Sequence, residues 1–255
     1  MSLPLRRVRG RIGAAGPGAP VRLRLICFPY AGAGAAVFRP WVDELPDDIE
    51  LCVPCLPGRD ARQDEPPAVA MAPLAAALAK GLWPMLDRPY ALFGHSMGAF
   101  LAFDLAHELA TAGAAPMHLF ASAQRGPRLP YPGPPMFTLP DADFLAAILK
   151  RYRAFPEPLL RDPEMMALLL RRLRGDFTLV EDYRYRASGL LDCPVTAFGG
   201  LEDRLIGRDQ LQAWSQETSA AFDLRMLPGG HFFVNEARPA LLAIIRKRLA
   251  LPPEA

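Results

Sequence analysis

The segment Gly94-His95-Ser96-Met97-Gly98 has residue types and a spacing that could support nucleophilic catalysis. This glycine-serine-glycine pattern forms a sharp turn when a strand runs into it and a helix leaves it. Here an apolar strand pattern over residues 90–93 precedes it, and a helical pattern over residues 99–112 follows. The two glycines leave room for a tight turn that lifts the serine hydroxyl into a crevice. The sequence therefore predicts that Ser96 is a nucleophile.

A serine hydroxyl needs a base to take its proton, and the base needs an acid to orient it. Of the four histidines, only His231 lies in a loop near the end of the chain, after the Pro228-Gly229-Gly230 turn. His95 lies inside the serine turn, whereas His107 and His118 fall in helical and strand patterns. We therefore expect His231 to be the general base.

The orienting acid is expected between the serine and the histidine in the chain. The loop at residues 199–204 reads Gly-Gly-Leu-Glu-Asp-Arg and offers two carboxylates. We predict that Asp203 orients the base, with Glu202 as the alternative, expected to be solvated. The strand pattern at residues 117–121 ends in Ser122-Ala123-Gln124, which offers no carboxylate.

Two backbone N–H groups must hold the negative oxygen that forms when a carbonyl is attacked. One is expected from Met97, the residue after the serine. The other is expected from the glycine-rich loop after the first strand pattern, at Tyr30 or Ala31.

The elements that would position these groups alternate between strands and helices. Strand patterns occur at residues 22–28, 49–56, 90–93, 117–121, 194–198 and 222–227, and helical patterns at 38–45, 73–86, 99–112 and 239–249. Such alternation is typical of a parallel sheet covered by helices on both faces. The predicted fold class is α/β, with a mostly parallel central sheet flanked by helices.

The alternation stops once, between residues 128 and 188, where two helical patterns follow a proline-rich entry. We expect residues 128–188 to form a helical lid over the carboxyl edge of the sheet. The core would then comprise residues 21–127 and 189–255. Residues 1–20 are rich in arginine, glycine and proline, and we expect a disordered tail, with an organelle transit peptide as the alternative.

Composition and charge argue against nucleic-acid-binding, membrane-spanning and secreted proteins. The chain has 255 residues, 51% of them hydrophobic, and a net charge of only +2, so a nucleic-acid-binding protein is disfavoured. No apolar run is long enough to span a membrane, and no secretory signal is visible, so we expect a cytoplasmic protein.

The Cys52-Val53-Pro54-Cys55 segment has the spacing of a redox pair or of half a metal site. It does not open a helical pattern, and no second cysteine or histidine pair follows at zinc spacing. We therefore expect buried thiols and no metal.

Four motifs, in order, closely resemble the type II thioesterases, the stand-alone editing hydrolases of polyketide and nonribosomal peptide assembly lines. They are Phe-Pro-Tyr-Ala-Gly at 28–32, Pro-Gly-Arg-Asp at 57–60, Gly-His-Ser-Met-Gly-Ala at 94–99 and Gly-His-Phe-Phe at 230–233. The resemblance covers about residues 22–249 and implies an α/β-hydrolase fold.

The resemblance also implies a catalytic triad and an activity. Ser96, Asp203 and His231 would form the triad, and Ala31 and Met97 would be the oxyanion donors. The substrates would be acyl groups on the phosphopantetheine arm of acyl or peptidyl carrier proteins, and hydrolysis would remove stalled or wrong units. No metal or diffusible cofactor is implied, because phosphopantetheine belongs to the carrier.

The expected lid suits an acyl substrate, although we expect most of its apolar residues simply to form its own core. The candidate substrate contacts are Tyr30, Met136, Phe137, Phe155, Met166 and Phe232. The lid also has an excess of basic residues, which could steer an acidic carrier protein or simply form a solvated face. Arg59 and Asp60 could order the loop near the site or only stabilise a turn.

Two other functions remain open. One is a lidded serine carboxylesterase or aminopeptidase that acts on a free small molecule. The other is a non-catalytic partner of acyl carrier proteins, which the complete Ser96, Asp203 and His231 set argues against. A monomer is the expected state.

Overall fold

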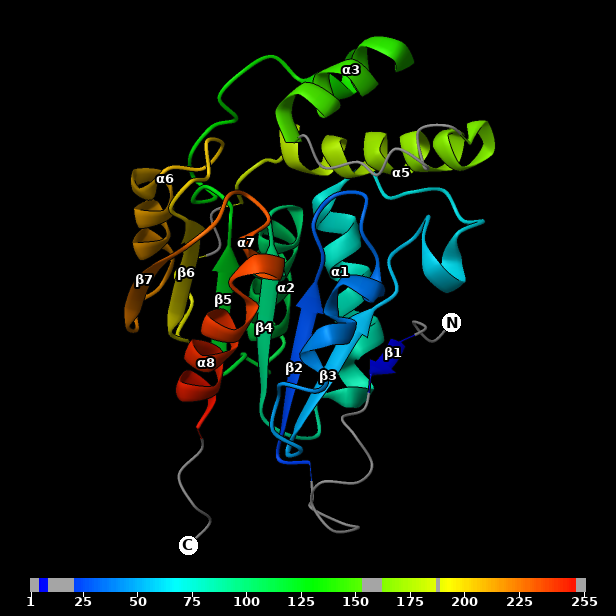
Figure 1. Cartoon of the computed structure of the whole chain (residues 1–255). Coiled ribbons are helices and arrows are strands. Elements are labelled where there is room, and N and C mark those ends of the chain that lie inside the picture. The colour runs from blue at the N-terminus through cyan, green and yellow to red at the C-terminus, as the bar shows by residue number, and fades with distance from the viewer. Residues whose placement is uncertain (1–4, 9–20, 153–161, 187–188, 251–255) are drawn as a thin grey trace, which may run out of the picture.

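The computed structural model describes residues 5–8, 21–152, 162–186 and 189–250. Its centre is a seven-stranded sheet in the order β1-β3-β2-β4-β5-β6-β7 (Figure 1). The strands are β1 Leu5–Val8, β2 Leu23–Phe28, β3 Ile49–Pro54, β4 Tyr90–His95, β5 His118–Ser122, β6 Val195–Gly200 and β7 Phe222–Leu227. Strands β2 to β7 are mutually parallel, and β1 pairs antiparallel with β3. The predicted α/β fold class is confirmed.

Helices cover both faces of this sheet. They are α1 Met71–Leu82, α2 Met97–Thr111, α3 Asp141–Tyr152, α5 Pro163–Glu181, α6 Arg208–Gln212, α7 Phe233–Glu236 and α8 Arg238–Leu249. A hydrophobic core lies on each face of the sheet, and alternate side chains of β2 pack into one or the other. Ile26 and Phe28 pack with α1 and α2, whereas Leu25 and Cys27 pack with α8 and the 3₁₀ helix Ala35–Trp41. This explains why the strand reads as a continuous apolar run.

The strand order reverses at β2, which lies between β3 and β4. The loops after β2 and β4 therefore leave the sheet in different directions, and a crevice opens at the carboxyl ends of these strands. Phe28 at the end of β2 pairs with Gly94 at the end of β4. The serine turn and the glycine-rich loop thus meet at this crevice.

Helices α3 and α5 lie between β5 and β6 in the chain and above the carboxyl edge of the sheet (Figure 1). We call residues 128–188 the lid. Phe144 and Ile148 of α3 pack on Leu173 and Phe177 of α5, so the lid has a small core of its own. Asp162 caps α5 by accepting hydrogen bonds from the first-turn N–H groups.

The expectation of a disordered tail over residues 1–20 is wrong for Leu5–Val8, which form β1. This strand runs along β3, with Leu5 opposite Pro54 and Val8 opposite Leu51, and occupies its outer hydrogen-bonding edge. Four residues are too short for an alternating pattern to be visible. Residues 1–4 and 9–20 lie outside the described part of the chain.

Two other expectations can be compared with the structure. Among the described helices, none is long and apolar enough to cross a membrane. All four cysteines fall within the described ranges and are buried, and none of them forms a disulfide. Cys52 and Cys55 are thus buried thiols at the end of β3, and Cys55 Sγ donates a hydrogen bond to the carbonyl oxygen of Arg59 at 3.4 Å.

Asp104 on α2 is a carboxylate whose burial should cost stability. Burial raises the pKa of Asp104 to about 6, although a hydrogen bond from the Tyr183 hydroxyl, 2.7 Å from Oδ1, lowers it. Between pH 4 and 6 the unfolded chain therefore ionises while the folded protein holds its proton, so stability falls as the pH rises through this window.

We predict that Asp104→Asn, which keeps the acceptor for Tyr183, stabilises the protein at pH 7.5 by about 3 kcal/mol, because the pKa is raised by about two units and each unit corresponds to roughly 1.4 kcal/mol. The gain should shrink toward zero as the pH falls toward 4. Thermal unfolding across this range checks it, with the exposed Asp43→Asn as control. A gain that does not depend on pH would contradict the ionisation argument.

Candidate active site

Ser96 lies in a strained turn between β4 and α2. Its backbone has φ 53° and ψ −116°, a conformation that side chains other than glycine rarely adopt. A Cβ atom on Gly94 would lie 2.0 Å from the carbonyl oxygen of Gly98, and one on Gly98 would lie 2.2 Å from that of Phe28. Both glycines are therefore required for α2 to approach the sheet this closely.

The three predicted triad residues are brought together by loops after three different strands. His231 Nε2 lies 3.1 Å from Ser96 Oγ, and His231 Nδ1 lies 2.9 Å from Asp203 Oδ2. The carboxylate can only accept, so Nδ1 carries the proton and Nε2 is left to accept the serine proton. The geometry is that of a nucleophile, its base and an orienting acid.

Asp203 is held in its ionised form. Burial alone would raise its pKa, but the bond with His231 and the backbone N–H groups of Leu205 and Ile206 outweigh burial and lower the pKa. The two N–H groups lie 2.8 and 3.3 Å from Oδ1. Glu202, the alternative acid, is exposed and accepts instead from the backbone N–H of Gly229.

His95, expected only to flank the nucleophile, bridges the serine turn and the histidine loop. It is fully buried, with Nδ1 2.8 Å from Ser122 Oγ and Nε2 2.9 Å from the carbonyl oxygen of His231. Burial lowers the pKa of His95 to about 3, so the ring is neutral near pH 7. Its Nε2–H donates to the His231 carbonyl, and its Nδ1 accepts from the Ser122 hydroxyl.

The predicted oxyanion donors come from the two segments that meet at the crevice, the start of α2 and the loop after β2. Met97 is the first residue of α2, and Ala31 follows β2. Within the part of the chain that the structure describes, neither backbone N–H has an acceptor. The N-terminal end of α2 also favours negative charge, because its N–H groups point outward.

A buried ion pair ties the loop after β2 to the lid. Gly32, at φ 80°, donates its N–H to Asp176 Oδ2 at 2.7 Å, and Arg59 Nη2 lies 2.5 Å from the other oxygen, Oδ1. Arg59 also donates to the carbonyl oxygen of Ala33 at 2.8 Å. Arg59 and Asp176 are almost fully buried, so α5 helps to set where Ala31 lies.

Two further side chains brace the same loop. Asp60 accepts from the N–H of Ala35 at 3.0 Å. Arg172 of α5 donates to the carbonyl oxygens of Gly58 and Gly32, at 3.0 and 3.3 Å. Arg59 and Asp60, for which sequence reasoning left the role open, thus both order the loop.

A cavity of about 470 Å³ opens beside Ser96 and His231, and it is mainly apolar. Its lining is Tyr30, Ala31, Gly32, Ala33, Val37, Ser96, Ile148, Tyr152, Leu169, Leu173, Phe177, His231, Phe232, Asn235 and Glu236. The ring of Tyr152, the last described residue of α3, lies 5.6 Å from that of His231.

The predicted substrate contacts divide into three groups. Tyr30 and Phe232 line the cavity. Met136 and Phe137 pack against the lid core, and Met166 is buried away from the cavity lining. Phe155 lies outside the described residues. Sequence reasoning missed Ile148, Tyr152, Leu173 and Phe177, because apolar helix residues carry no signal for which helix face meets the cavity.

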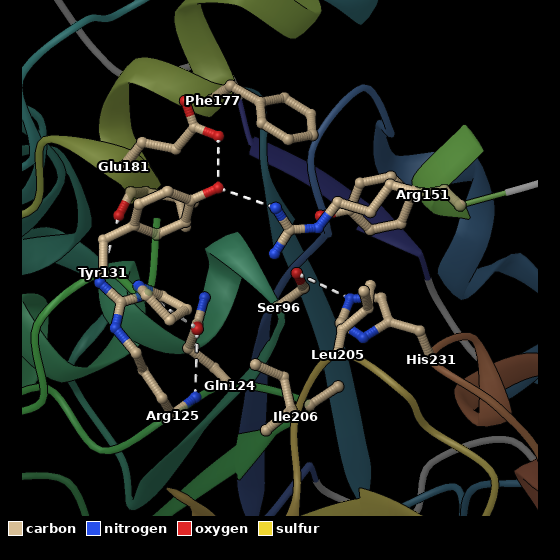
Figure 2. Close-up of a pocket in the computed structure, with 14 residues that line it drawn as sticks. Ser96, Gln124, Arg125, Tyr131, Arg151, Phe177, Glu181, Leu205, Ile206 and His231 are labelled. Carbon is tan, nitrogen blue, oxygen red and sulfur yellow. Dashed lines mark hydrogen bonds between the residues drawn. The ribbon is translucent and has the colours of Figure 1, made fainter. Parts of the chain in front are cut away.

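A second, smaller pocket of about 30 Å³ lies on another side of Ser96 (Figure 2). Apolar and polar residues line it in similar measure, and the polar and charged ones include Gln124, Arg125, Tyr131, Arg151 and Glu181. None of these side chains was singled out as a substrate contact from the sequence, because three separate segments contribute them.

Only some of the basic side chains of the lid are exposed at its surface. Arg172 and Arg174 donate hydrogen bonds to backbone carbonyls, and Arg151 lines the smaller pocket. Lys150 and Arg171 are exposed. Arg153 and Arg161 lie outside the described residues.

Comparison with known proteins gives consistent matches. The family model described as the thioesterase domain matches residues 23–249. The gramicidin S biosynthesis protein GrsT of Aneurinibacillus migulanus is 38% identical over 231 residues, 90% of each chain.

Two solved structures are similar over nearly the whole chain. The type II thioesterase BorB from the borrelidin biosynthetic cluster has a TM-score of 0.85 at 34% identity, over 96% of this chain and 97% of that one. The RedJ thioesterase from the prodiginine pathway of Streptomyces coelicolor has a TM-score of 0.82 at 37% identity, over 92% and 91%.

Neighbouring carboxylates allow a matched test of the base-orienting acid. We predict that Asp203→Asn slows labelling of Ser96 by a fluorophosphonate probe by about 10⁴-fold, because the wrong tautomer of His231 is favoured. Glu202→Gln should label at the wild-type rate, since its side chain is exposed and glutamine keeps an acceptor for the Gly229 N–H. Equal rates for the two variants would show that Asp203 does not orient the base.

A second prediction follows from the ion pair between Asp176 of the lid and Arg59. Asp176→Asn should slow the same labelling by about 10- to 100-fold, because the loop that carries Ala31 loses its anchor. It should also lower stability by about 3 kcal/mol, because Arg59 is left buried without its partner. Asp141→Asn, which breaks an exposed lid pair with Arg174, is the control. Unchanged labelling of folded Asp176→Asn would contradict the anchoring role.

Proposed function

This chain belongs to the thioesterase family, and on that premise we propose that it is an editing hydrolase that removes acyl groups from carrier proteins of a polyketide or nonribosomal peptide assembly line. The observation that carries the proposal is the Ser96–His231–Asp203 chain of hydrogen bonds at the mouth of an apolar cavity. The similarity to proteins named for such pathways, GrsT, BorB and RedJ, supports the substrate class.

In the first half of the reaction, His231 Nε2 takes the proton of the Ser96 hydroxyl as its oxygen attacks the thioester carbonyl carbon. Negative charge develops on the carbonyl oxygen, where the N–H groups of Ala31 and Met97 can donate to it. The bond to sulfur then breaks, the protonated His231 returns its proton to the leaving thiolate, and the acyl group stays on Ser96.

In the second half, His231 removes a proton from water, and the resulting nucleophile attacks the acyl-serine carbonyl. The same two N–H groups stabilise the oxyanion, and His231 returns the proton to Ser96 as the free acid leaves. Asp203 stays ionised and stabilises the positive charge that His231 carries in both halves. His231 carries out every proton transfer and the two N–H groups stabilise both oxyanions, so we propose that the chain needs no cofactor of its own.

The larger cavity beside Ser96 suits a chain-like part of a carrier-bound thioester. The 470 Å³ cavity has mainly apolar walls from α3, α5 and the loop after β2. It is large enough for a chain-like ligand, such as a phosphopantetheine arm or a long acyl chain. Carrier proteins commonly present acidic helices, and the exposed Lys150 and Arg171 could contribute to their docking.

The test of the proposal follows the mass of a carrier protein. Carriers loaded with a panel of acyl groups are incubated with the wild type or with Ser96→Ala, and loss of the acyl mass is measured by intact-protein mass spectrometry. We predict loss with the wild type and a rate at least about 10⁴-fold lower with Ser96→Ala. Cleavage of small esters without cleavage of any acyl-carrier would instead indicate an esterase acting on free molecules.

A further inference from the structure

The smaller pocket beside Ser96 carries charges that the reaction itself does not use. Figure 2 shows the Tyr131 hydroxyl between the carboxylate of Glu181 and the guanidinium of Arg151, with Ser96 below that guanidinium. Arg125 and Gln124 lie at another side of the pocket (Figure 2). The chemistry of the triad requires none of these five side chains.

Arg125, in the loop after β5, is a buried cation whose acceptors are neutral. Its side chain is about 2% exposed and donates to the carbonyl oxygen of Leu129 at 3.0 Å and that of Val180 at 3.4 Å. The guanidinium also lies 4.8 Å from the centre of the Phe100 ring. Within the described ranges, no carboxylate oxygen lies within 4 Å of it. Burial lowers the pKa of Arg125 to about 10, so it remains charged near pH 7.

Among the residues that the structure describes, none accepts a hydrogen bond from one edge of the Arg151 guanidinium, near the end of α3. Its Nη1 donates to the Tyr131 hydroxyl oxygen at 2.8 Å. Its Nε is buried and has no acceptor among the residues described. Nε–H and Nη2–H lie side by side on the guanidinium, and this edge matches the two oxygens of a carboxylate.

The single carboxylate of the pocket is already occupied. Glu181 accepts from the Tyr131 hydroxyl at 2.7 Å through one oxygen and from the N–H of Phe137 at 3.0 Å through the other. The pocket lining thus has two guanidinium groups against one carboxylate, an excess of one positive charge. A buried charge without a counter-ion is costly, so an anionic ligand group would be favoured here.

The size of the pocket limits that group. A volume of about 30 Å³ holds roughly one or two water molecules and is too small for a long acyl chain. Ser96 and His231 line the same pocket, so a group within it lies close to the acyl carbonyl.

We propose that this pocket selects short acyl groups that carry a terminal carboxylate, held by the free edge of Arg151 with Arg125 supplying further positive charge. The inference rests on the proposed function, because the carboxylate belongs to the acyl group that Ser96 attacks. It makes Arg151 a specificity residue. The carboxylate takes no part in bond making or breaking.

The test compares carriers loaded with three four-carbon acyl groups: succinyl, which is anionic, acetoacetyl, which has a neutral acceptor, and butyryl, which has neither. The wild type should cleave succinyl-carrier with a kcat/KM about 10- to 100-fold above that for the other two. Arg151→Met should remove this preference by lowering the succinyl rate and should leave butyryl cleavage within about threefold. Arg246→Met, which removes an exposed arginine on α8, should keep the wild-type pattern.

Three results would overturn the assignment. They are equal wild-type rates for the three acyl groups, acetoacetyl cleavage as fast as succinyl cleavage, and an equal loss of all three rates in Arg151→Met. Failure to cleave any carrier, with Ser96 still reactive to a fluorophosphonate, would overturn the proposed function instead. Succinyl and butyryl thioesters of N-acetylcysteamine would then decide the pocket, and equal rates on these two would also refute it.

Discussion

The close approach of α2 to the ends of β2 and β4 is the constraint on which the site depends. Gly98 packs against the carbonyl oxygen of Phe28, and Gly94 packs against the carbonyl oxygen of Gly98. No side chain fits at either position. This contact forces Ser96 into a left-handed conformation and points the N-terminus of α2 at the crevice. The remaining catalytic groups must therefore be brought to Ser96, and the strand order, with its reversal at β2, does this.

Buried polar contacts then hold those groups in place before any substrate arrives. His95 joins the loop of His231 to Ser122 at the end of β5, and the Leu205 and Ile206 N–H groups fix Asp203. On the other side, Asp176 holds Gly32 from the lid. Donors and dipoles that are already oriented need little reorganisation when the oxyanion forms, and electrostatic stabilisation of this kind is a large part of enzymatic rate enhancement. The lid is thus part of the catalytic framework as well as a wall of the cavity.

Sequence patterns predicted the six parallel strands, because each strand is visible as a short apolar run. They also predicted Ser96, Asp203 and His231, because each of these residues lies in a loop directly after a predicted strand. What they missed depends on packing between distant segments. The approach of Asp176 to Gly32, 144 positions away, and of Glu181 to Tyr131 leaves no local pattern. Met136 and Phe137 were expected at the cavity but pack against the lid core, because the sequence does not show which apolar lid residues face the cavity.

The central claim is that Ser96 carries the acyl group between the two halves of the reaction. The most direct measurement is an acid quench during turnover of an acyl-carrier, followed by mass analysis of proteolytic peptides. The account predicts that the peptide containing Ser96 gains the mass of the acyl group, and that the adduct disappears once substrate is exhausted. Turnover with no adduct under conditions in which deacylation limits the rate, or an adduct on another residue, would contradict it.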